Sequence, residues 1–246
     1  MTGLDRNQTP KMRPMQRNRS ALVASLDIGT SKIACLIGRL KPSAPNDALR
    51  GRTHSVELIG YSQIQSRGMK AGAVADLAQC EQAVRQAVSL AEQMAKVRVE
   101  SVLLPVSAGR LQGQLIEAAS HIQGGAVTSS DVSLVTSTGM RHATAPGRTV
   151  LHALPVGYSL DGVKGIRDPR GMVARRFGVD MNVVTAEATV AKNLMLAVER
   201  CHLTVEAMAA SPYVAGLSVL TDDEADLGAA VVEMGAGTTT IAIYSA

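Results

Sequence analysis

A strand–turn–strand pattern occurs twice in this sequence, about 200 residues apart. The first copy runs from Ala24 to Cys35 and the second from Val231 to Ile243. In each copy an apolar strand ends in a carboxylate, an apolar residue and a glycine follow, and small hydroxyl residues lead into a second strand. A repeat of such long period predicts two similar lobes, each contributing one turn.

The residues of these turns are suited to bind phosphate and a divalent cation. Glycine lets backbone amides approach phosphate oxygens, and hydroxyl groups add donors. The carboxylates of Asp27 and Glu233 would repel phosphate, so a cation must lie between them, and Mg²⁺ prefers one or two carboxylates plus phosphate oxygens. We therefore predict that the turns clamp a triphosphate and that both carboxylates hold Mg²⁺ through water. The predicted cofactor-binding residues are Asp27, Gly29, Thr30, Ser31, Lys32, Glu233, Gly235, Gly237, Thr238 and Thr239.

The phosphate prediction depends on both turns and not on a known nucleotide-binding signature. One such turn alone is an ordinary β-hairpin more often than a phosphate loop, so the prediction depends on the pair. The sequence matches neither the P-loop pattern nor the dinucleotide-binding glycine pattern. Two roles are open for Lys32: contact with a phosphate, or a solvent-exposed lysine at the end of a strand.

Composition excludes some classes of partner. Aromatic residues are 2% of the chain and Trp is absent, so the stacking surfaces of single-stranded nucleic-acid binders are not expected. The net charge of +4 lies in residues 1–20, with five basic residues and one acidic residue. We predict a disordered basic tail there, with contact to acidic lipid or nucleic acid as the alternative. No apolar run approaches the ~18 residues of a membrane span, and the three cysteines lack metal-site spacing, which indicates a cytoplasmic chain.

Hydrophobic periodicity divides the chain into regular and irregular parts. Strands are predicted at 21–26, 32–40, 56–65, 101–106, 181–185, 204–210, 227–233 and 239–244. Helices are predicted after the N-cap Asp76, over 190–201, and from Ser211 with Pro212 at the first helical position. Residues 221–226 read as an acidic loop. Residues 107–177 are rich in Gly, Ser and Thr with short apolar runs and one short helix from Asp131, which predicts an inserted subdomain.

The two turns resemble the first and second phosphate motifs of the actin-like ATPase superfamily. Further motifs resemble the FtsA family of actin-like bacterial cell-division proteins, and the similarity extends from about residue 22 to residue 246. These motifs are Ser66–Met69, Leu151–Pro155, Gly165–Pro169 and Ala197–Cys201.

The resemblance implies an α/β, actin-like ATPase fold whose first lobe is RNase H-like and carries the inserted IC subdomain of FtsA. It implies subdomain IA at 21–106 and 178–209, subdomain IC at 107–177, and the start of subdomain IIA at 210–246. The second lobe would be truncated, because the chain ends at Ala246. We therefore expect this polypeptide alone to bind ATP poorly and to expose an open sheet edge.

The resemblance also implies a function. FtsA-type proteins bind ATP, self-associate, link the FtsZ ring to the cytoplasmic membrane at midcell, and recruit later divisome proteins. By resemblance, recruitment would use residues 107–177, and membrane contact would use a C-terminal helix that is absent from this chain. The alternatives are a PilM-type pilus-assembly ATP-binding protein and an actin-like-fold small-molecule kinase. Nucleic acid is not an expected partner.

Three positions depart from the family pattern. Glu233 stands where the second phosphate motif usually has Asp, and Thr240 stands where the family often has Asp. Ser211 precedes Pro212, where ATP-hydrolysing relatives have Glu or Gln. Serine is too short and too weakly basic to orient water well, so weak or absent hydrolysis is expected and no catalytic residue is predicted. A plain N-cap role suffices to explain Ser211.

Overall fold

A computed structural model of the chain describes residues 9–12, 15–43, 53–122, 125–143 and 145–244. These residues form two compact units. The main unit comprises Thr9–Gly109 and Thr189–Ala246, and the inserted unit comprises Arg110–Ala188. Each unit is described by itself below.

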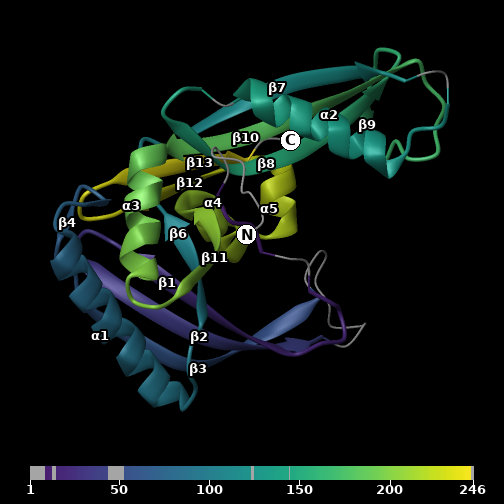
Figure 1. Cartoon of the computed structure of the whole chain (residues 1–246). Helices are drawn as coiled ribbons and strands as arrows, with labels where there is room; N and C mark the ends of the chain where they lie inside the picture. The colour runs from purple at the N-terminus through teal and green to yellow at the C-terminus, as the bar shows by residue number, and fades with distance from the viewer. Residues whose placement is uncertain (1–8, 13–14, 44–52, 123–124, 144, 245–246) are drawn as a thin grey trace. The chain divides into compact units, whose positions relative to one another are not determined.

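The main unit is built on a five-stranded sheet. Strands β1 (Ala21–Ile28), β2 (Lys32–Pro42) and β3 (His54–Gln65), all predicted from the sequence, form an antiparallel meander. Strands β6 (Ser101–Val106) and β11 (Thr204–Ala210) add parallel to it, giving the order β11-β6-β1-β2-β3 (Figure 1). Continuous apolar runs in β1, β2 and β6 fit strands buried in a layered core.

Helix α1 (Leu77–Ala95) lies along β2 and β3 (Figure 1). It begins where the sequence predicts, because the Asp76 carboxylate accepts the backbone amide of Gln79 at 3.0 Å and so caps the helix. It ends at Lys96, which takes the left-handed conformation. Helix α3 (Ala188–Glu199) lies where a helix is predicted at 190–201, starts two residues earlier, and buries Leu194 and Val198. Within the described residues, no helix is both long and apolar enough to span a membrane.

The end of the chain contributes a small second sheet. Its strands β12 and β13 pair with each other in antiparallel fashion, and helix α4 packs against them. A further short pair, β4 and β5, precedes α1. The bounds of these elements are β4 Met69–Lys70, β5 Ala73–Val74, α4 Ser211–Val219, α5 Asp222–Leu227, β12 Ala229–Met234 and β13 Thr239–Tyr244.

The predicted acidic loop at 221–226 is wrong, because this segment forms helix α5. Thr221 accepts the amide of Glu224 through its hydroxyl, and the Glu224 carboxylate accepts the amide of Thr221 in return. This reciprocal pair is a capping box, and the T-x-x-E spacing that encodes it is visible in the sequence.

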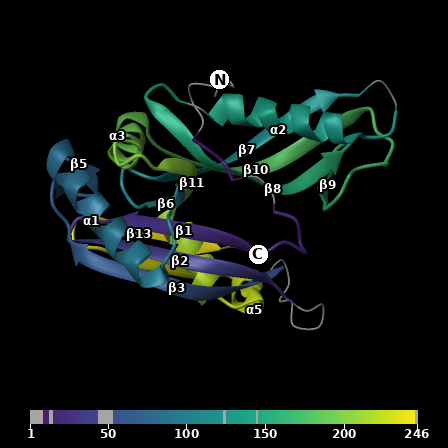
Figure 2. The ribbon, with the colours of Figure 1, turned by 60° about the horizontal axis from the view of Figure 1, so that its bottom comes forward.

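The inserted unit is a four-stranded sheet with one helix against it. The strand order is β7-β10-β8-β9, and α2 covers one face (Figure 2). The core contains the chain's single Phe, Phe177, which is fully buried and stacks on Tyr158 with ring centroids 5.6 Å apart. The bounds are β7 Gln112–His121, α2 Ser129–Ala143, β8 Arg148–Leu160, β9 Val163–Ile166 and β10 Arg176–Glu187.

The boundaries of the insertion differ from the prediction. The predicted segment ended at residue 177, but β10 continues to Glu187 and pairs along its length with both β7 and β8. Residues 178–188 therefore belong to the inserted unit and not, as predicted, to the lobe around it. The described residues from 210 to 244 lie in the same compact unit as the five-stranded sheet, with α4 contacting β11 and β6.

The described part of the predicted disordered tail is held against the main unit. Thr9 is buried, and the Pro10 carbonyl accepts the backbone amide of Met208 at 3.3 Å. At the other end, the Arg19 carbonyl interacts with the His54 ring nitrogen Nε2 at 3.0 Å. The predicted disorder is therefore wrong for these residues, and its remainder at 1–8 and 13–14 lies outside the described residues.

Candidate functional site

The two turns singled out in the sequence are closed in the same way. In both, four residues separate the last paired strand residues, Ile28 with Ile33 and Met234 with Thr239. In both, the glycine amide donates to the carbonyl three residues later, Gly29 to Lys32 at 3.0 Å and Gly235 to Thr238 at 2.8 Å. The sequence repeat is therefore also a repeat of backbone geometry.

The first turn is anchored to the segment that follows β3. The Ser31 carbonyl accepts the backbone amide of Ser66 at 3.0 Å. The Thr30 hydroxyl accepts the backbone amide of Gly72 at 2.8 Å. Ser31 and Lys32 are exposed at the tip. The turn is thus fixed from one side while its tip remains accessible.

The second turn lies directly against the first. A Cβ atom added at Gly237 would come within 2.5 Å of the Thr30 hydroxyl oxygen and 2.9 Å of the Ala71 Cα, so only glycine fits this approach. The Thr238 hydroxyl donates to the Ser107 hydroxyl at 3.5 Å. The fold therefore brings together turns that lie about 200 residues apart in the sequence.

The two carboxylates occupy equivalent places beside these turns. Asp27 pairs with Ala34 in β1–β2, and Glu233 pairs with Thr240 in β12–β13. Burial raises the pKa of Asp27, and the negative charge of Glu233 raises it further, while Lys32 partly lowers it. The negative charge of Glu233 therefore acts on Asp27 across the two turns.

The surroundings of Glu233 were not predicted. Ser211 at the start of α4 donates its hydroxyl to Glu233 Oε1 at 2.8 Å, and Thr240 in β13 donates its hydroxyl to Oε2 at 3.1 Å. The predicted N-cap role of Ser211 is wrong, because the N-cap position is Ala210 and makes no side-chain cap. The contact joins residues 22 positions apart, so no local pattern in the sequence could reveal it.

The other predicted residues divide into two groups. Gly29, Thr30, Gly235, Gly237 and Thr238 form or support the adjoining turns described above. Thr239 is exposed as the first residue of β13.

These groups fit a hydrated magnesium ion bound together with phosphate. Two mutually repelling carboxylates beside glycine turns and hydroxyls provide the hard oxygen ligands that Mg²⁺ takes, and a cation would relieve their repulsion. The described residues contain no group of three or more His, Cys, Asp or Glu arranged to hold a metal alone. A cation here would therefore need water or phosphate oxygens as further ligands.

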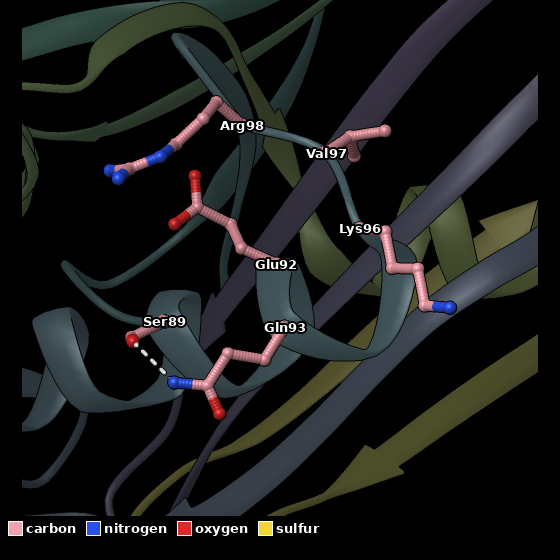
Figure 3. A pocket seen from close by; sticks show the side chains of 6 residues that line it. All are labelled: Ser89, Glu92, Gln93, Lys96, Val97 and Arg98. Carbon is pink, nitrogen blue, oxygen red and sulfur yellow. Dashed lines mark hydrogen bonds between the residues drawn. The ribbon is translucent and has the colours of Figure 1, made fainter.

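A separate surface hollow of about 360 Å³ lies at the C-terminal end of α1 (Figure 3). Its polar groups serve local structure: Glu92 accepts the backbone amide of Val99 at 2.7 Å, and Gln93 donates to Ser89 at 3.4 Å. The lining residues are Ser89, Glu92, Gln93, Lys96, Val97 and Arg98. The hollow contains none of the predicted site residues.

Comparison with known proteins shows which proteins this chain is similar to. Residues 108–185 match the family described as "SHS2 domain inserted in FTSA". Over 236 residues the chain is 47% identical to the cell division protein FtsA of Agrobacterium fabrum, an alignment that covers 96% of this chain and 53% of that protein. By sequence, the chain is a relative of FtsA. FtsA of Escherichia coli K12 is 35% identical over 91% of the chain and 51% of its own length, and FtsA of Neisseria meningitidis serogroup B is 32% identical over 90% and 51%.

A solved structure supports the fold. A chain of the "PilM-PilN type IV pilus biogenesis complex" superposes with a TM-score of 0.53 at 13% identity, over 90% of this chain and 61% of that chain. At this identity the likeness concerns the fold alone. Together with the FtsA relatives and the inserted SHS2 domain, it confirms the predicted mixed α/β fold of the actin-like class. The chain spans about half the length of the FtsA proteins that it matches.

Proposed function

We propose that the adjoining turns form the phosphate end of an ATP site, with Mg²⁺ held between Asp27 and Glu233. The observation that carries this proposal is the same closure of the two turns, which adjoin each other, with the two carboxylates at equivalent positions in their strands. The amides of Gly29 and Gly235 already close their own turns, so phosphate would contact the other amides and hydroxyls at the tips. When bound, Mg²⁺ would neutralise charge on the phosphate oxygens.

We further propose that the chain acts in bacterial cell division as part of an FtsA-type protein. Its similarity to FtsA of several species supports this role. In this proposal the whole protein self-associates and links the FtsZ ring to the cytoplasmic face of the membrane at midcell. The inserted unit recruits later divisome proteins, and membrane contact belongs to a C-terminal helix outside this sequence.

The alternative functions have less support. A PilM-type role is favoured only by a fold likeness at 13% identity, against 47% identity to FtsA. A small-molecule kinase needs a carboxylate free to act as a base toward a substrate hydroxyl. Here both oxygens of Glu233 accept hydrogen bonds from hydroxyls, and burial and the charge of Glu233 raise the pKa of Asp27. The same arrangement agrees with weak or absent hydrolysis.

Equilibrium titration with ATP and Mg²⁺ tests the nucleotide site. The titration is made on this chain and on a longer form that includes the remaining length of its FtsA relatives. We expect the longer form to bind more tightly, and Asp27→Ala to abolish binding in any form that binds. Absence of binding in both forms would refute the nucleotide site. Unchanged binding in Asp27→Ala would refute the role of this turn.

Co-sedimentation with FtsZ polymers tests the division role separately. We expect the longer form to sediment with FtsZ, and an equal amount of an unrelated actin-like protein to stay in solution. If the longer form behaves like that control, the proposed link to FtsZ is wrong, whatever the result with ATP.

A further inference from the structure

Ser211, Glu233 and Thr240 meet in one place. Ser211, Glu233 and Thr240 come from α4, β12 and β13, and the two hydroxyls donate to the two oxygens of the same carboxylate at 2.8 and 3.1 Å. All three side chains are partly buried. Three polar side chains that lie apart in the sequence thus form one hydrogen-bonded group.

The two hydrogen bonds restrict the position of the Glu233 carboxylate. Glu233 has one more rotatable bond than Asp, so its carboxylate can occupy more positions unless something fixes it. Hydrogen bonds to an ionised acceptor are stronger than those between neutral groups, and one bond on each oxygen sets both the place and the plane of the carboxylate. Ser211 is aimed by the start of α4, and Thr240 by its pairing with Glu233 across the hairpin.

We propose that Ser211 and Thr240 are positioning residues that hold the Glu233 carboxylate beside Asp27, so that the two carboxylates bind a divalent cation together with a nucleoside triphosphate. This inference rests on the nucleotide site proposed above and assigns two residues to it. Outer hydrogen-bond partners of a metal-binding carboxylate commonly set metal affinity without touching the metal. Because each hydroxyl donates its single proton to Glu233, neither can donate to a water at the same time.

The test separates cation binding from nucleotide binding. ATP affinity is measured with excess Mg²⁺ and again with EDTA, in the form of the chain that binds ATP, and the ratio of the two affinities is the readout. Ser211→Ala and Thr240→Val each remove one hydroxyl. We expect each to reduce the Mg²⁺-dependent gain roughly tenfold while the EDTA affinity changes little. The conservative variants Ser211→Thr and Thr240→Ser should restore most of the gain.

A matched control lies on the same helix. Ser218 in α4 donates its hydroxyl to the Ala215 carbonyl and is exposed, so Ser218→Ala should keep the full Mg²⁺-dependent gain. Thermal unfolding of every variant identifies any that fails to fold. Ser211→Ala and Thr240→Val change different elements, so if one of them does not fold, the other still tests the inference.

Each outcome decides the question. An undiminished Mg²⁺-dependent gain in both Ser211→Ala and Thr240→Val overturns the inference and leaves the nucleotide site intact. ATP binding that is the same with Mg²⁺ and EDTA in the parent chain also overturns it. If no form of the parent binds ATP, the proposed site itself fails, and the inference fails with it.

Discussion

The two phosphate-type turns share their length and their closing hydrogen bond, yet their surroundings differ. Strand β1 lies in the middle of a five-stranded sheet, where Leu26 is completely buried. Strand β12 belongs to a two-stranded sheet, and Val232 and Met234 on its outer face are 51% and 80% exposed. The comparison shows that a short local sequence sets the shape of a turn, whereas its rigidity depends on the layer beneath it.

The carboxylates show the same contrast. Asp27 is held by the burial of its strand, with a raised pKa as the consequence. Glu233 is held by two hydroxyl donors instead. The first turn therefore depends on core packing and the second on side-chain hydrogen bonds, and the following experiments test that difference in order of effect.

The largest difference should come from truncating one apolar side chain beneath each turn. Leu26→Ala leaves a cavity in the core and should lower the free energy of unfolding by about 2–5 kcal/mol. Val232→Ala, on the exposed face, should change it by less than about 0.5 kcal/mol. Urea unfolding followed by circular dichroism measures both. Similar losses in the two variants would contradict the contrast.

Separating the two turns should have the next largest effect. Gly237→Ala places a methyl group against Thr30 and Ala71 and should destabilise the chain by about 1–3 kcal/mol. Gly235→Ala is the control, since its nearest neighbour outside the adjoining residues is the Thr238 carbonyl at 3.2 Å, and it should cost less. Adding Thr30→Ala to Gly237→Ala should recover part of the loss. A purely additive double variant would show that the turns do not touch.

A smaller effect should distinguish the helix caps. Asp76→Ala removes the cap of the long helix that covers β2 and β3, and should cost about 1 kcal/mol. Thr221→Ala removes the capping box of α5, a six-residue helix without buried residues, and should cost the folded chain less. Thermal unfolding compares the two. A greater loss from Thr221→Ala would reverse the expected ranking.

The smallest expected effect is a gain in stability, whereas the changes above reduce it. A raised pKa in the folded state means that folding disfavours the ionised Asp27, so Asp27→Asn should raise the melting temperature by about 1–3 °C without nucleotide and metal at pH 7. Glu233→Gln should give no such gain, because the amide nitrogen of Gln cannot accept one of the two hydroxyl hydrogen bonds. A lower melting temperature for Asp27→Asn would show that Asp27 is not strained by its surroundings.

Local patterns predicted the main unit well. The patterns that predict it involve residues close together in the sequence. They are the apolar runs of β1 and β2, the apolar stripe of α1 and the residues that close each turn. The predicted strands at 101–106, 204–210 and 239–244 match β6, β11 and β13 at both ends. In these places the surface that a residue buries is set by its own element, so periodicity is informative.

The remaining features depend on contacts over long distances in sequence. Strand β7 contains Gln, Gly, Ala and Ser and buries Ala118, so its sequence shows little apolar alternation. Its pairing with β10 is therefore not visible in the local pattern. The bond between Ser211 and Glu233 requires α4 and β12 to be placed first. The capping box at Thr221 is different, because its signal was present in the sequence and an acidic run obscured it.

The contact of Pro10 with β11 affects how the main sheet can associate. Strand β11 is an edge strand of the sheet, and the Met208 amide donates to the Pro10 carbonyl. Proline has no amide hydrogen, so Pro10 cannot donate a hydrogen bond to β11. A ladder of paired strands cannot propagate through such a residue. The other side is β3, twelve residues long with Val56 and Leu58 exposed. Intermolecular strand addition, with the fibre growth that can follow, is therefore favoured at β3 over β11.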